Sequence, residues 1–186
     1  IALTATLLLN ACKSPSAKPA PAAAATEQEA KLIAVLKSDA PQKEKADACR
    51  ELAHVGTKAS VPTLIALLGD EKMSHMARYG LETNPDPAVN KALRDALPTL
   101  KGRQLAGVIT SFGVRKDAEA AKLVGKFLQD ADPDVASAAA RALGDIATKP
   151  AVQALEAALP TATGVQQLAV APDADLCDDC LRELFD

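Results

Sequence analysis

Apolar residues at helical spacing recur at a fixed interval along the chain from Thr26 onward. Leu52 is matched by Leu143, and Leu81 and Phe112 occupy the two intervening copies, so the successive spacings are 29, 31 and 31 residues. A period of about thirty residues is typical of helical hairpins, each of which buries its apolar face against its neighbours. The pattern predicts an all-α chain of stacked helix pairs, about four of them complete.

Turn residues divide each copy into two helices. In Asp86-Pro87 and Asp132-Pro133 the carboxylate can accept a bond from free amides at the helix start, while the proline occupies the first turn, where its missing donor costs nothing. The predicted helices cover residues 41–55 and 59–68, 71–83 and 87–97, 102–112 and 117–129, and 133–147 and 150–159.

The two ends of the repeat domain, residues 26–186, differ from its middle. Residues 26–37 carry Leu32, Ile33 and Leu36 on one face, which predicts a second helix without its first, capping the N-terminal end of the stack. Residues 168–186 begin a fifth, incomplete copy, so we expect a chain truncated at both ends.

Motifs in the last complete copy carry a resemblance to a known family. Asp132-Pro-Asp-Val135, then Ala-Ala-Arg-Ala-Leu-Gly144, and Ala151-Val-Gln-Ala-Leu155 resemble the bacterial HEAT repeats first named from phycobilisome lyase subunits. The resemblance covers residues 41–159. It implies a right-handed α-solenoid of HEAT-like helical hairpins and says little about activity.

The N-terminus has the features of a targeting sequence rather than of a folded segment. Residues 1–11 form an apolar run of about ten residues, much too short to span a bilayer as a helix. Leu9-Asn-Ala-Cys12 resembles the bacterial lipobox, which implies cleavage before Cys12 and acylation of its thiol and new amino group. The alternative is an ordinary secretory signal cleaved near Ala11, with Cys12 incidental.

Residues 12–25 follow as a lipidated cysteine and a Pro/Ala-rich tether, because prolines without backbone donors favour extended conformations. Lys13 stands where many Gram-negative lipoproteins retained in the inner membrane carry Asp. We therefore predict a lipid-anchored protein of the bacterial cell envelope, with the outer membrane favoured.

Composition narrows the classes of partner. The chain is 48% hydrophobic but only 2% aromatic, and its formal net charge is -3. An acidic balance without a long Lys/Arg run provides no electrostatic attraction to phosphate backbones, so nucleic acid is a poor candidate. Leu, Val, Ile and Ala suit a core of closely spaced helices.

His75, Arg78, Tyr79 and Glu82 form the most distinctive polar cluster in the sequence. His75 and Tyr79 share one helical face at i and i+4. The cluster is a candidate partner-contact site or an acid/base pair. The alternative is an Arg78–Glu82 ion pair that stabilises an exposed helix, with His75 packed against the neighbouring turn.

A ladder of polar residues runs along the predicted second helices. Lys91, Lys122 and Gln153 are equivalent by the offset of 31, and Arg94 and Lys126 lie close by. If the second helices line the concave side, this ladder is the candidate partner-facing strip. A solvated face is the other interpretation.

The remaining cysteines and histidines do not form a recognisable chemical site. Cys49 reads as a small buried residue, and zinc would need His54, His75 and Cys49 to be brought together. Cys177 and Cys180 form a lone CxxC, for which packing or a local disulfide is favoured over redox catalysis. We expect no catalytic residue, cofactor or metal.

These observations predict a non-enzymatic, membrane-anchored scaffold or adaptor that binds an unknown protein partner. The alternative, which rests on the resemblance, is an accessory protein for chromophore or cofactor handling, related to phycobilin lyase subunits.

Overall fold

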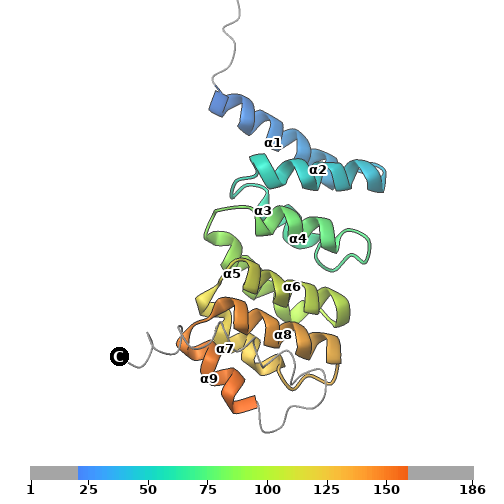
Figure 1. Ribbon diagram of the computed structural model, residues 1–186. Helices are drawn as coiled ribbons and strands as arrows, with labels where there is room; N and C mark the ends of the chain where they lie inside the picture. The colour runs from blue at the N-terminus through green and yellow to red at the C-terminus, as the bar shows by residue number, and fades with distance from the viewer. Residues whose placement is uncertain (1–20, 159–186) are drawn as a thin grey trace, which may run out of the picture.

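The computed structural model describes residues 21–158 and shows nine α-helices, three 3-10 helices and no strand in that range (Figure 1). The first helices of the four pairs are α2 (Gln42–Val55), α4 (Ser74–Glu82), α6 (Gly102–Val114) and α8 (Pro133–Ile146). Their second helices are α3 (Val61–Ala66), α5 (Ala88–Ala96), α7 (Ala121–Val124) and α9 (Lys149–Ala158).

The helix pairs are stacked in chain order. In the first-helix layer α2 packs on α4, α4 on α6 and α6 on α8, while in the second-helix layer α3 packs on α5 and α7 on α9. Figure 1 shows the pairs following one another down a single elongated stack. The predicted all-α class and α-solenoid architecture are confirmed.

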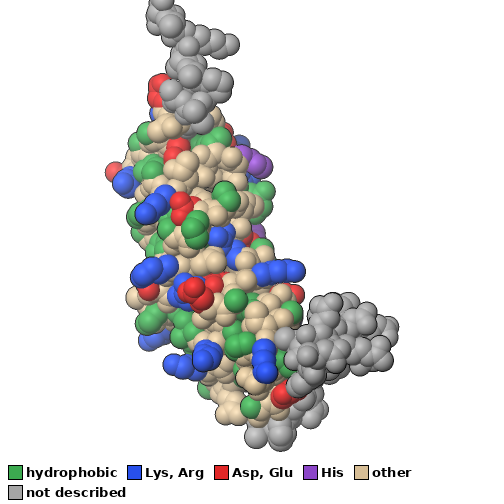
Figure 2. Space-filling model, turned by 90° about the vertical axis from the view of Figure 1, so that its left-hand side faces the viewer, with side chains coloured by type: hydrophobic (Ala, Val, Ile, Leu, Met, Phe, Trp, Pro, Cys, Tyr) green, Lys and Arg blue, Asp and Glu red, His purple; other side chains and the backbone are tan. Residues whose placement is uncertain are grey.

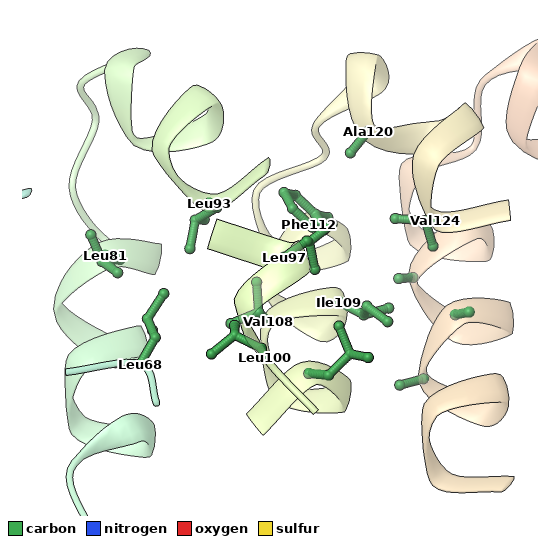
Figure 3. Packing of buried hydrophobic residues seen from close by; sticks show 14 of the residues in the cluster. Leu68, Leu81, Leu93, Leu97, Leu100, Val108, Ile109, Phe112, Ala120 and Val124 are labelled. Atoms are coloured by element: carbon green, nitrogen blue, oxygen red, sulfur yellow. The ribbon is translucent and has the colours of Figure 1, made fainter. Parts of the chain in front are cut away.

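The residues that define the sequence period form the core of the stack. Leu52, Leu81, Phe112 and Leu143 are all fully buried. Phe112 is the largest side chain with this burial, and Figure 3 shows its ring among Leu93, Leu97, Ala120 and Val124. Each pair therefore contributes the same positions to one continuous core, as the period requires.

Turn chemistry sets the helix starts as predicted. Asp132 is the N-cap of α8, where its Oδ1 accepts a hydrogen bond from the amide of Asp134 at 3.0 Å and Pro133 occupies the first turn. Asp86 Oδ1 accepts a bond from the amide of Ala88, the first residue of α5, at 2.8 Å.

The second helix of the third pair differs from the prediction. Residues 117–129 were expected to form one helix, but they form η2 (Ala118–Ala120), the four-residue α7 and η3 (Gly125–Phe127). Gly125 is the residue at which α7 ends, and glycine is a poor helix former. Asp117, which precedes the segment, makes no capping bond and is paired with Arg94 of α5 instead.

Helix α1 (Pro21–Lys37) starts earlier than predicted. The tether was expected to extend to Ala25, but Ala22 to Ala25 are helical in the structure, consistent with alanine being the best helix former. α1 packs mainly against α2, as a cap at the N-terminal end of the stack, and the 3-10 helix η1 (Leu97–Thr99) extends α5.

A buried carboxylate fastens α1 to the first pair. Glu29 is 2% exposed and accepts hydrogen bonds from the amide of Thr57 at 2.7 Å, from its hydroxyl at 2.8 Å, and from the amide of Ser60 at 3.2 Å. It thus satisfies the amides of Thr57 and Ser60 in the turn that leads into α3. Cys12, Cys177, Cys180 and the predicted fifth copy lie outside the described residues.

Candidate partner-binding surface

The predicted cluster on α4 separates into an exposed and a packed part. His75 and Tyr79 are exposed, Tyr79 at 41%, whereas the side chain of Arg78 is only 18% exposed. Arg78 Nη1 donates to the carbonyl oxygen of Gly107 on α6 at 3.2 Å and lies 3.4 Å from Glu82 Oε1. The Arg78–Glu82 ion pair is present, and it faces the next repeat rather than solvent.

Glycines on the first helices show how close the neighbouring helices come. A Cβ at Gly80 would lie 3.2 Å from the carbonyl oxygen of Cys49, and one at Gly113 would lie 3.0 Å from Cα of Ala142. A Cβ at Gly107 would instead meet Arg78 Nε at 2.7 Å. Two of the three junctions bring backbone close to backbone, while α4 and α6 are joined through an arginine.

Further polar groups complete the junction between α4 and α6. Ser111 of α6 donates its hydroxyl to Glu82 Oε1 at 2.6 Å. Arg78 Nε is buried and has no hydrogen-bond partner among the described residues, because the guanidinium lies against the backbone of Gly107. His75 Nδ1 lies 3.4 Å from Arg78 Nη2. Side-chain hydrogen bonds from both helices therefore join α4 to α6.

Arg115, which was not singled out from the sequence, has the densest hydrogen bonding in this region. It follows α6 and donates through Nη1 to the carbonyl oxygens of Leu81 at 2.8 Å, Glu82 at 3.1 Å and Asn84 at 2.7 Å. These carbonyls belong to the end of α4 and the turn after it, where helix carbonyls lack internal partners.

Burial lowers the pKa of the Arg115 guanidinium, and the carboxylates of Asp117, Glu82 and Asp86 oppose that shift. Arginine remains charged despite such shifts, because its ordinary pKa is so high. The sequence contains one indication of the contact between Arg115 and Asn84: the two residues are 31 positions apart, which is one repeat length.

The cationic residues of the second helices also differ in exposure. The Arg94 side chain is 20% exposed and pairs with Asp117, which is 3% exposed, while its other nitrogen lies 2.7 Å from Glu119. Lys91 is exposed and pairs with Asp95 at 2.6 Å on its own helix. Arg94 is therefore committed to joining two repeats, which reduces its availability to a partner.

Lys122 and Lys126, the two remaining cations of the predicted ladder, are both exposed, and neither forms an ion pair among residues 26–158. They lie one turn apart across α7 and η3. Figure 2 shows Lys and Arg side chains along the length of the stack on the face that it draws, with carboxylates beside several of them.

An apolar groove of about 570 Å³ lies between α3 and α5. Its walls come from both second helices and from the segments that follow them, and Asp95 and Thr99 are its polar side chains. The lining residues are Val61, Pro62, Ile65, Ala66, Leu68, Gly69, Ala92, Asp95, Ala96, Thr99 and Leu100.

Comparison with protein families supports the architecture. A family model described as HEAT repeats matches residues 79–171, which is half of the chain. The chain belongs to the HEAT-repeat family. No curated protein matches it, and no enzyme family was found.

HEAT repeats generally serve as protein-interaction scaffolds and are usually non-catalytic. Aligning the second helices of these HEAT repeats by their buried leucine or valine, at Leu64, Leu93, Val124 and Leu155, gives two columns of surface positions. Every member of these columns is exposed. From α3 to α9 the pairs are Pro62 and Ala66, Lys91 and Asp95, Lys122 and Lys126, and Gln153 and Ala157.

The chemical groups considered for metal binding are not gathered in the described HEAT repeats. Cys49 is fully buried, and burial raises the pKa of its thiol to about 11, so the thiolate needed for metal binding is disfavoured. Within residues 26–158 no group of three His, Cys, Asp or Glu residues could hold a metal ion. In the same part of the chain no helix is long and apolar enough to cross a membrane.

Proposed function

We propose that this HEAT-repeat chain is a non-enzymatic scaffold that binds a protein partner through its second helices and is held at a bacterial envelope membrane by a lipid on Cys12. The observation that carries the proposal is the exposed strip of the second-helix columns, which combines an apolar groove with two cations that have no ion pair among the described residues. Exposed apolar and charged groups side by side are typical of a partner surface.

The contacts of the first helices also favour the second helices as the binding surface. The buried polar side chains of α4 and α6 face each other across the junction, which leaves them already paired within the stack. His75 and Tyr79 remain candidate contacts at the edge of that layer, because both are exposed. His75 and Tyr79 both lie on α4, whereas the exposed positions of the second-helix columns continue over all four pairs and form a longer strip.

The proposed anchor rests on sequence. The lipobox-like residues Leu9 to Cys12 precede a short Pro-rich segment, and α1 begins at Pro21. A lipid on Cys12 would therefore be separated from the first helix by the eight residues 13–20. Two or three acyl chains hold a protein on a membrane far more firmly than one. Lys13 favours the outer membrane.

A site-specific crosslink tests the scaffold function. A photoreactive amino acid is placed at Lys122, and at Arg141 on α8 as a matched exposed position of the first-helix layer. In intact cells we expect one defined protein to be crosslinked from position 122 and much less of it from position 141. Equal capture from both positions, or none from either, would contradict the proposed surface.

A substitution at the anchor gives the second test. Cys12→Ala is expected to move the protein from the membrane pellet to the soluble fraction of lysed cells, without changing its helical circular dichroism, because Cys12 precedes α1. Cys180→Ala serves as the matched cysteine control and should stay in the pellet. A Cys12→Ala protein that remains in the pellet would show the anchor assignment to be wrong.

A further inference from the structure

The chemistry of the second-helix columns changes in a fixed order along the stack. At α3 the exposed pair is Pro62 and Ala66, which line the apolar groove. At α5 Lys91 and Asp95 neutralise each other through their ion pair at 2.6 Å. At α7 and η3 the pair is Lys122 and Lys126, and at α9 it is uncharged. The strip therefore has an apolar end, a neutral middle and a basic section.

We infer from this order that the partner binds through a short segment with apolar side chains at one end and carboxylates at the other, the apolar end in the groove between α3 and α5 and the carboxylates at Lys122 and Lys126. This inference rests on the proposed function and specifies the partner of that same surface. The apolar end gains from removing groove surface from water, and the acidic end gains from two cations that have no ion pair among the described residues.

The spacing between packed helices sets the distance between the groove and the basic pair Lys122 and Lys126. Neighbouring helices lie about 10 Å apart, so the groove and the basic pair are separated by roughly 15 Å. An extended chain advances about 3.3 Å per residue, which makes the required spacer about five residues. The Lys91–Asp95 ion pair lies at the α5 wall of the groove, which Asp95 lines, and because the two charges neutralise each other it favours uncharged polar residues in the spacer that leaves the groove.

The charges also argue against the opposite polarity. A cationic segment at α7 would meet Lys122 and Lys126 without a carboxylate paired to either of them in the described part of the chain. The nearby carboxylates Asp117 and Glu119 are both occupied by Arg94. Like charges brought together at an interface disfavour binding, so the basic section selects an acidic end.

A labelled peptide tests the inference with the purified full chain. The probe is a fluorescein-labelled peptide with two leucines at one end and three glutamates at the other, separated by about five Gly/Ser residues. We expect saturable binding by fluorescence anisotropy. A peptide with lysines in place of the glutamates, or without the spacer, should bind at least about tenfold more weakly.

Variants locate both ends of the peptide. Lys122→Glu with Lys126→Glu should weaken binding at least about tenfold, whereas Lys43→Glu with Arg141→Glu makes the same change in net charge on exposed first-helix positions and should leave it unchanged. Ala66→Asp and Ala66→Lys should both weaken binding, because the two opposite charges each make the exposed wall of the groove polar.

Other occupants would give different results. Binding to vesicles of phosphatidylglycerol and phosphatidylethanolamine that needs Lys122 and Lys126, without peptide binding, would assign the strip to an anionic membrane and overturn the inference. A concentration-dependent dimer mass that Ala66→Asp abolishes would assign it to a second copy, with the same consequence. If the peptide fails while position 122 still crosslinks a defined protein, this partner chemistry is wrong and the scaffold function stands.

Discussion

Replacing Phe112 with alanine is expected to lower the free energy of unfolding by about 3–5 kcal/mol. Phe112 is fully buried in α6 and is the largest side chain of the core, in contact with the cluster that joins the second and third pairs. Its removal loses the transfer free energy of the ring and leaves a cavity that the surrounding helices can fill only in part. Urea unfolding followed by circular dichroism measures the change.

A nearby exposed residue provides the control. Val114 is the last residue of α6 and is 58% exposed, so Val114→Ala should change the free energy of unfolding by no more than about 0.5 kcal/mol. If Phe112→Ala had an effect as small as that of Val114→Ala, the third pair could not be packed around this ring.

Removing the guanidinium of Arg115 is expected to lower the free energy of unfolding by about 3 kcal/mol in Arg115→Met. Methionine keeps much of the apolar stem but leaves the carbonyl oxygens of Leu81, Glu82 and Asn84 without their shared donor. A half-buried carbonyl that loses its hydrogen bond loses stability, and the loss is partly compensated where water can enter. The effect should be visible as a lower unfolding midpoint and as faster hydrogen exchange at the end of α4.

Two variants separate the hydrogen bonds from the charge. Arg103 is an exposed residue of α6, the helix that Arg115 follows, and Arg103→Met should be nearly neutral. Arg115→Lys keeps a positive charge but cannot present the arginine fork to several carbonyls at once, so it should recover less than half of the loss. Equal stability of Arg115→Met and Arg103→Met would remove Arg115 from this structural role.

Together Arg78 and Arg115 make the junction between the second and third pairs different from the others. At this junction hydrogen bonds to backbone carbonyls and to Glu82 replace part of the close backbone packing seen at Gly80 and Gly113. Such a polar junction depends on complete pairing, because each unpaired buried group is costly. The exposed His75 and Tyr79 lie at its edge, where a partner could contact them.

The part of the fold that repeats was predictable from the sequence. Leu52, Leu81, Phe112 and Leu143 recur because every helix pair must bury the same face against its neighbours, and all four are fully buried. The starts of α5 and α8 followed from Asp86 and Asp132, because a capping carboxylate bonds to amides only two residues away. Local chemistry of this kind is contained in a short stretch of sequence.

The second helix of the third pair was not predictable in the same way. Its apolar pattern matches the other copies, yet the backbone forms two 3-10 segments around α7. Asp117, the residue that could have capped a helix there, is held by Arg94 from the preceding repeat, 23 residues away. Periodicity reports which face is buried but not which tertiary contact competes for the helix end.

The sequence by itself therefore determined the helix pairs, their order and the residues of their core, since these depend on periodic burial and on local caps. Only the tertiary structure decided which cations remain at the surface. The sequence made Arg78 and Arg94 candidate partner contacts, as it did Lys122 and Lys126, but Gly107 and Asp117 of the next repeat engage the two arginines. Their partners are 29 and 23 residues away along the chain, and stacking alone brings such groups within hydrogen-bonding distance.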